Sequence, residues 1–218
     1  MQANGFAINT VSDLERAAQA LIGLDGRFAV LHGRNGLPPL RLRPGGLEGL
    51  AWIVTGQLIS ARAAAAIWQR VSAALVPFDA AAIARMDEGD LAMLGLTRAK
   101  ARTIIAAAKA ECEGVFDHAA LCKLDDAAAS AKLMALKGIG RWSADIYLMT
   151  CLGRPDAWPA GDLAVRSGLQ GLLGLETLPP VAAMDDLAER WRPWRAVAAR
   201  YLWAHHASGR TGKAVGSA

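Results

Sequence analysis

Residues 136–145 read LKGIGRWSAD and hold two glycines that are separated by a single isoleucine. Gly138 and Gly140 can adopt backbone angles that residues with a Cβ resist, and they let a ligand come close to the main chain. Residues 127–136 are rich in good helix formers, and a helical pattern resumes over residues 142–152. The stretch therefore predicts two helices joined by a tight glycine turn.

The N–H groups of such a turn, together with the N-terminus of the second helix, favour an anion such as a phosphate. A dinucleotide-binding fold would place a strand before its glycines and usually add a third glycine, and this sequence does neither. The phosphate of a nucleic-acid backbone is the better candidate. The predicted phosphate-binding residues are Lys137, Gly138, Ile139, Gly140 and Arg141. An ordinary helix corner closed by glycines is the alternative.

The composition indicates an all-α protein of about ten helices. Of the 218 residues 53% are hydrophobic, largely alanine and leucine, and the formal net charge of +4 permits an anionic partner. The three cysteines are widely spaced and odd in number, which is typical of reduced thiols. The N-terminal residues do not resemble a signal peptide, and no apolar stretch is long enough to cross a bilayer. We expect a cytoplasmic protein, associated with the nucleoid if bacterial, with no membrane partner.

Helix starts are predicted where a side chain can cap an N-terminus: Thr10 or Ser12, Asp79, Thr97, Asp117, Asp125 and Asp162. The helical pattern from Leu47 to about Leu75 predicts two helices that meet near Ser60. Residues 23–45 are interrupted by glycine and proline and predict an irregular connection, in which FAVLH (28–32) and LRLR (40–43) are candidate short strands. We expect one domain over residues 1–218 with two helical subdomains. The first spans about 45–155 and carries the hairpin, the second combines 1–44 with 156–208, and 209–218 form a disordered tail.

A carboxylate follows the hairpin in the segment AWPAGDLAVR, residues 157–166. Asp162 stands where a helix begins, and capping that helix would be the commonest role for an aspartate there. Beside a turn that holds a nucleic-acid backbone, the same carboxylate can face the sugar of a captured nucleotide. Cleavage of an N-glycosidic bond builds positive charge on the deoxyribose, which an anion stabilises, and a carboxylate can also orient the attacking water. Asp162 is the candidate catalytic residue.

The hairpin and Asp162 together resemble the helix-hairpin-helix DNA glycosylase superfamily. Two further segments are similar to its alkylpurine branch, the 3-methyladenine DNA glycosylase II family: IVTGQLISARAA (53–64) and WRPWRAVAARYLW (191–203). The resemblance covers roughly residues 45–208. It implies two helical subdomains flanking a DNA-binding cleft, in a monomeric enzyme that flips damaged bases out of double-stranded DNA.

The resemblance also implies roles for particular residues. Gln57 and Leu58 correspond to the segment that intercalates where the base has left the stack. The candidate walls of the base pocket are Trp142, Trp52, Trp158 and Trp203, because an indole face attracts a cationic alkylated purine. From the residues alone, core packing is the alternative for each of these six side chains. Ile146 stands where the family often has an aromatic residue, and Tyr147 should face elsewhere.

Trp142 stands where the bifunctional members of the superfamily carry a nucleophilic lysine, so the resemblance implies no strand-cutting lyase activity. No cysteine follows Cys151, which excludes the superfamily's iron–sulfur cluster. We expect no metal held by side chains, although the resemblance suggests a monovalent cation on backbone carbonyls of the hairpin.

Two other functions stay open. One is a helix-hairpin-helix module that binds damaged DNA without cutting it, and the other is a glycosylase for deaminated or oxidised bases. Arg98, Lys100 and Arg102 give the helix after Thr97 a basic start, which predicts either a second phosphate contact or a solvated charged face.

Overall fold

The computed structural model describes residues 6–214 of the chain, in which all regular structure is helical. The chain divides into two compact units: unit 1 comprises residues 1–42 and 153–218, and unit 2 comprises Arg43–Leu152. No helix in the described part of the chain combines the length and hydropathy needed to cross a membrane.

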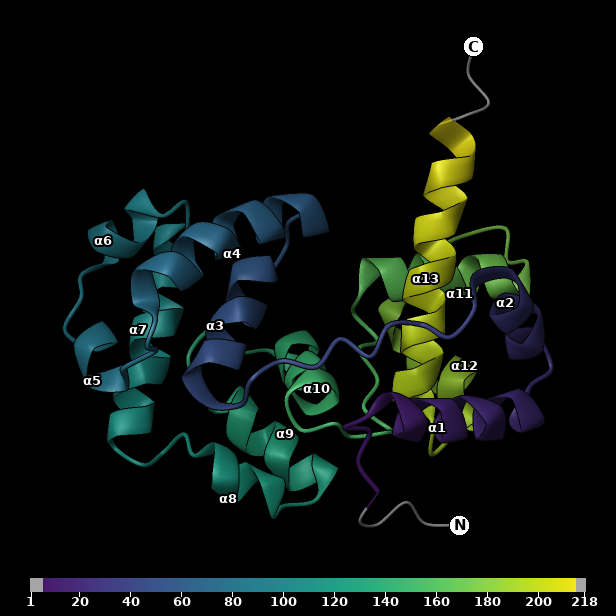
Figure 1. Ribbon diagram of the computed structural model, residues 1–218, viewed down its shortest axis with the longest axis horizontal. Helices are drawn as coiled ribbons and strands as arrows, with labels where there is room; N and C mark the ends of the chain where they lie inside the picture. The colour runs from purple at the N-terminus through teal and green to yellow at the C-terminus, as the bar shows by residue number, and fades with distance from the viewer. Residues whose placement is uncertain (1–5, 215–218) are drawn as a thin grey trace. The chain divides into compact units, whose positions relative to one another are not determined.

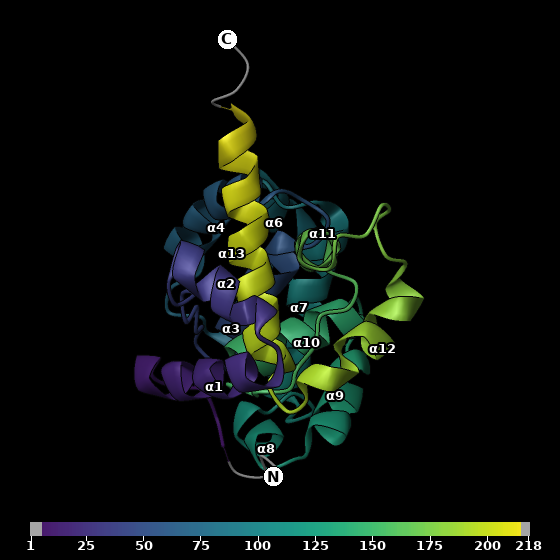
Figure 2. The same cartoon turned by 90° about the vertical axis from the view of Figure 1, so that its right-hand side faces the viewer.

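Unit 1 consists of helices from both ends of the chain (Figures 1 and 2). Its helices are α1 (Val11–Leu24), α2 (Arg27–Asn35), α11 (Leu163–Leu173), α12 (Met184–Ala188) and α13 (Arg195–Ala214), with short 3₁₀ helices at Val181–Ala183 and Glu189–Trp191. Helix α11 packs against α13. Gly168 allows this close approach, because a Cβ there would collide with the backbone of Leu202 on α13. The contact fixes the start of α11, where Asp162 lies, against the helix that carries Trp203.

Unit 2 is built around α3 (Gly46–Gly56), which buries Leu47, Leu50, Ile53 and Val54. The other helices of unit 2 are α4 (Ala61–Leu75), α5 (Ala80–Ile83), α6 (Glu88–Met93), α7 (Arg98–Cys112), α8 (His118–Cys122), α9 (Asp126–Met134) and α10 (Arg141–Thr150). Helix α7 packs on α3, α5 and α6, while α10 packs on α9 and α3 (Figure 1). The turn between α9 and α10 is the predicted glycine hairpin.

Capping side chains begin helices as expected at Thr10, Thr97 and four aspartates, and the two helices expected to meet near Ser60 are α3 and α4. Thr10 caps α1, Ser60 caps α4 and Thr97 caps α7, and in each case the hydroxyl accepts the N–H of the residue three positions further on. The aspartates at 79, 117, 125 and 162 cap α5, α8, α9 and α11. Each side-chain oxygen satisfies an N–H that the first turn of a helix leaves without an intrahelical partner.

Two predictions about local structure were wrong. The segment FAVLH lies in helix α2, and residues 40–43 form no strand. Phe28 and Leu31 are both buried at a spacing of three residues, which suits one face of a helix and overrides the appearance of a strand. Helix α13 continues to Ala214, so residues 209–214 of the expected disordered tail are helical, since extending a helix costs less than starting one. Residues 215–218 of that tail lie outside the described residues.

Unit 1 contains a buried polar contact at the end of α1. Asp25 accepts the Nε1–H of Trp191 at 2.9 Å and hydrogen bonds from Arg27, whose Nη2 lies 2.6 Å from Oδ2. The hydrogen bond from Arg27, supported by that from Trp191, lowers the pKa of Asp25 from 3.8 to about 2. The ring of Phe28 packs edge-on against Trp191 at 5.1 Å, which closes the core around this contact.

We predict that the contribution of Asp25 to stability depends on pH. Because its pKa is lower in the folded chain, the contribution is complete above about pH 4 and is lost as the pH falls toward 2. At pH 7 the substitution Asp25→Asn should lower the free energy of unfolding by about 2 kcal/mol. Urea unfolding at pH 7, 4, 3 and 2 checks this. A difference between the two proteins that stays constant over this range would contradict it.

Candidate nucleic-acid interface and catalytic carboxylate

The turn between α9 and α10 needs a glycine at its first position. Gly138 has a φ of +82°, and a Cβ there would collide with the side chain of Thr103 on α7. Ile139 follows with only 5% of its surface exposed, and its N–H donates to the carbonyl of Leu136 at 3.1 Å. The isoleucine is therefore an apolar anchor in unit 2, and the exposed parts of the turn are Lys137, Gly138 and Gly140.

Helix α10 begins at Gly140 without a side-chain cap, in contrast to the eight helices of the described chain that Thr, Ser or Asp side chains cap. Its N-terminus carries the positive end of the helix dipole, and the exposed Lys137 and Arg141 lie on either side. The Nε of Arg141 lies 3.5 Å from Oδ2 of Asp145, one turn further along α10. This arrangement favours an external anion at the turn.

Leu58, the predicted intercalating residue (called the wedge below), follows the end of α3. Leu58 has a φ of +58°, in the left-handed region that a residue with a γ-branched side chain rarely adopts, and its side chain is fully exposed. An apolar side chain held in solvent by an unfavourable backbone angle fits an inserting role better than a packing role. The core-packing alternative for Leu58 is therefore wrong.

The side chain of Gln57 is half-buried and bonds to the hairpin. Its Nε2 donates to the carbonyl of Gly138 at 3.1 Å and to the hydroxyl of Ser143 at 2.9 Å. The resemblance places Gln57 beside Leu58 at the intercalating segment, and in the structure its amide nitrogen bonds within unit 2. Nothing in the sequence indicated this contact, because 81 and 86 residues separate Gln57 from its two partners.

Asp162 is the N-cap of α11 and is half-buried. Its Oδ1 accepts the N–H groups of Ala164 at 2.9 Å and Val165 at 3.0 Å, and also the Nε1–H of Trp203 at 3.1 Å. All three bonds use the same oxygen, so they fix the plane of the carboxylate. The capping role that the sequence offered as an alternative is real, and it orients the carboxylate for any further role.

The four predicted pocket tryptophans differ in their surroundings. Trp52, Trp142 and Trp203 are half-buried, whereas Trp158 is 2% exposed. The Nε1–H of Trp158 donates to the carbonyl of Met184 at 3.0 Å, and its ring packs edge-on against Trp191. Trp158 therefore belongs to the core of unit 1, and its prediction as a pocket wall is corrected.

Two arginines that the sequence analysis did not single out lie over the tryptophans. The guanidinium of Arg41 lies 5.7 Å from the ring centroid of Trp203, and that of Arg43 lies 4.2 Å from that of Trp52. Both distances are within the range of cation–π contacts. The alternating LRLR segment was interpreted as a strand, although its two arginines were the signal that could have identified these partners.

Tyr147 is buried in the core of unit 2. Its hydroxyl accepts the N–H of Gly46 at 2.8 Å and lies 2.9 Å from Nδ1 of His118. Burial raises the pKa of Tyr147 and lowers the pKa of His118. These contacts hold the start of α3, and Ile146 is also buried, so neither side chain presents a face for stacking.

The basic residues of α7 make contacts within unit 2. The Nζ of Lys100 donates to the carbonyl of Thr55 at 2.9 Å, and burial lowers its pKa. Arg102 pairs with Glu88 at 3.0 Å. Of the open alternatives, a phosphate contact made by Lys100 is disfavoured, because its ammonium group already supports the last turn of α3.

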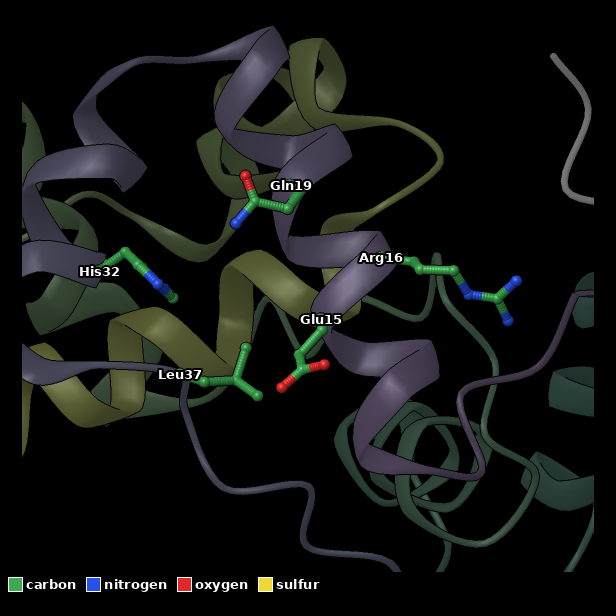
Figure 3. A pocket seen from close by; sticks show the side chains of 5 residues that line it. All are labelled: Glu15, Arg16, Gln19, His32 and Leu37. Atoms are coloured by element: carbon green, nitrogen blue, oxygen red, sulfur yellow. The ribbon is translucent and has the colours of Figure 1, made fainter.

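A hollow in unit 1 lies away from all of these residues. It is lined by Glu15, Arg16, Gln19, His32 and Leu37 (Figure 3). The Arg16 guanidinium points away from the other four side chains and pairs with Asp13 at 2.6 Å. The hollow contains none of the predicted site residues.

The two units each carry one group of predicted residues. Unit 2 brings together the hairpin, Gln57 and Leu58, while unit 1 brings together Asp162 and Trp203. Arg41, which was not predicted, lies over the Trp203 ring. The glycine hairpin leads into a helix without a side-chain cap, and an oriented carboxylate follows downstream in the chain. These two features define the class of helix-hairpin-helix proteins that act on DNA. The chain belongs to the HhH-GPD superfamily of base excision DNA repair proteins, whose family model matches residues 51–193. The resemblance stated from the sequence is confirmed.

The sequences of individual proteins are also similar to this chain. The chain is 31% identical over 121 residues to a DNA-3-methyladenine glycosylase of Bacillus subtilis, a match that covers 56% of this chain and 40% of that protein. It is 26% identical over 199 residues to the alkylbase DNA glycosidase-like protein mag2 of Schizosaccharomyces pombe, covering 88% and 93% of the two chains. The chain thus spans about two fifths of the length of the Bacillus relative.

A solved structure gives the same result for the fold. The 3-methyladenine DNA glycosylase Mag1 of Schizosaccharomyces pombe, in complex with abasic DNA, superposes with a TM-score of 0.80 at 28% identity. The match covers 86% of this chain and 95% of Mag1.

We predict that Gly138 and Gly140 serve different purposes. The substitution Gly138→Ala should lower the free energy of unfolding by at least about 1–2 kcal/mol, because it forces a Cβ into a left-handed position against Thr103. Gly140 has a φ of −98° and open space around its Cβ position. Gly140→Ala should therefore cost only about 0.5 kcal/mol, for a poorer N-cap.

DNA affinity should separate the two variants further. If a phosphate sits against the turn, Gly140→Ala weakens binding to duplex DNA while leaving the protein folded. Fluorescence anisotropy with a labelled duplex, alongside urea unfolding, measures both quantities. Wild-type affinity in folded Gly140→Ala would contradict a phosphate at this turn.

Proposed function

We propose that the protein is a monofunctional DNA glycosylase that removes alkylated purines of the 3-methyladenine and 7-methylguanine type. The carboxylate of Asp162 carries this proposal: it is oriented by three N–H donors in a chain of a base excision repair family. The names of the relatives support the substrate class.

Binding begins at the hairpin. Lys137, Arg141 and the backbone N–H groups around Gly140 hold one phosphate of the damaged strand, which positions the protein but reads no sequence. Leu58 enters the base stack and fills the gap that the flipped nucleotide leaves. Trp142 is the candidate indole face for the damaged base, because a π face attracts its positive charge.

Cleavage then needs few groups. The bond between C1′ and the purine nitrogen breaks, its electron pair neutralises the cationic base, and positive charge develops on the sugar. The carboxylate of Asp162 stabilises this charge and orients a water. The water oxygen bonds to C1′, and its proton passes to the carboxylate and on to solvent. Since an N3- or N7-alkylated purine leaves as a neutral molecule, no general acid is needed.

The product is an abasic site in an uncut strand. Lyase chemistry needs an amine that attacks C1′, and the position that would carry it is Trp142. Activity without an iron–sulfur cluster stays a prediction. A monovalent cation on the hairpin carbonyls stays a prediction, as does the monomeric state, and no step uses either.

The test is base release from methylated duplex DNA. The variant Asp162→Asn keeps an oxygen that can accept the N–H groups of Ala164 and Val165, so α11 stays capped. We predict that release of 3-methyladenine and 7-methylguanine falls by about 100-fold or more, with DNA affinity and the thermal midpoint little changed. The matched control is Asp125→Asn, which alters the N-cap of α9 and should leave release unchanged.

Two results would contradict the proposal. Equal release of bases by the wild type and Asp162→Asn would show that Asp162 is not the catalytic carboxylate. DNA binding without release of any alkylated, deaminated or oxidised base would leave a damage-binding module.

A further inference from the structure

The segment that carries Leu58 lacks support from its own packing. Residues 57–60 join α3 to α4, the Leu58 side chain is fully exposed, and Ile59 is 38% exposed. A left-handed backbone angle at Leu58 is unfavourable for a residue with a Cβ. Something outside the segment must therefore hold Leu58 in this conformation.

The two hydrogen bonds of Gln57 supply that support. One acceptor, the Gly138 carbonyl, lies in the glycine turn, and the other, the Ser143 hydroxyl, lies in the first turn of α10. Ser143 is 2% exposed. Through its amide nitrogen, Gln57 is thus bonded to residues on both sides of the start of α10.

Helix α7 supports both ends of this connection. The Lys100 ammonium group donates to the Thr55 carbonyl in the last turn of α3, directly before the wedge segment. The Thr103 side chain packs against Gly138, where it leaves no room for a Cβ. The wedge segment and the hairpin are therefore attached to one another and to the same face of α7.

We propose that Gln57 is a positioning residue that locks the Leu58 wedge to the phosphate-binding hairpin through its amide nitrogen. Contact of the hairpin with a backbone phosphate then sets where Leu58 enters the base stack. The inference rests on the proposed function, and it assigns Gln57 a partner within the protein in place of a contact with DNA.

Insertion can be measured without cleavage. A duplex with a tetrahydrofuran abasic analogue and a neighbouring 2-aminopurine reports unstacking by fluorescence, and an undamaged duplex reports the backbone contact by anisotropy. Gln57→Met keeps the length of the side chain but removes the donor. We expect affinity for undamaged DNA to change little, while the insertion rate falls by about tenfold, the equivalent of two neutral hydrogen bonds.

Ser143→Ala distinguishes the lock from a direct contact with DNA. Ser143 is buried, so its loss affects insertion only through Gln57. We expect a smaller loss of insertion in Ser143→Ala, and the double variant should be no worse than Gln57→Met alone. Normal insertion in Ser143→Ala beside slow insertion in Gln57→Met, or losses that add in the double variant, would overturn the proposal.

The assay also separates this proposal from the proposed function. Leu58→Ala is the reference variant, which lacks the wedge but keeps Gln57. The thermal midpoints of the Leu58, Gln57 and Ser143 variants show whether each protein remains folded. Insertion that depends on Gln57 and Ser143 supports the lock even if the wild type releases no base. Insertion that is unaffected by either change contradicts the lock even if base release is confirmed.

Discussion

The close packing of α7 against the glycine turn is the constraint on which the rest of unit 2 depends. Thr103 occupies the space in which a Cβ of residue 138 would lie, so the turn exists only with glycine there. That turn ends α9, buries Ile139 and starts α10 at a residue without a side-chain cap. It also presents the carbonyl that accepts the hydrogen bond of Gln57. The predicted phosphate contact and the position of Leu58 thus depend on one local packing contact.

In unit 1, the two roles predicted for Asp162 are compatible. Asp162 caps α11 and is the candidate catalytic group, and the two roles support each other because the N–H groups of the first turn and of Trp203 fix the carboxylate. The contact of α11 with α13 that Gly168 allows places Trp203 for this bond. Arg41 lies over the face of the same indole, which links a residue of the chain between α2 and α3 to the carboxylate.

Local chemistry made much of the fold predictable. Capping side chains such as Thr10, Asp79 and Thr97 marked helix starts correctly, because a cap depends on residues within one turn. Helix α2 was not predicted, because its N-cap, Gly26, has no side chain that could mark the helix start. In addition, its apolar residues fit a short strand as well as a helix. The glycine hairpin and Asp162 were found from spacing and from the family resemblance.

Contacts between distant segments could not be predicted in the same way. A tryptophan suits a pocket wall and a core equally, and only the packing of Trp158 on Trp191 decides for the core. The partners of Gln57 lie more than 80 residues away, and the arginines over Trp52 and Trp203 come from a segment without regular structure. The sequence thus indicated candidate site residues, while the structure showed which contacts hold them.

The central claim is hydrolysis at a carboxylate with no amine nucleophile. Its most direct test is mass spectrometry of a DNA strand that carries a single 7-methylguanine, after reaction of the duplex with the protein and with borohydride present in a parallel sample. The account predicts a strand of unchanged length in which a hydroxyl has replaced the base, and no trapped protein–DNA adduct. A strand cut at the lesion, or a borohydride-trapped adduct, would contradict it.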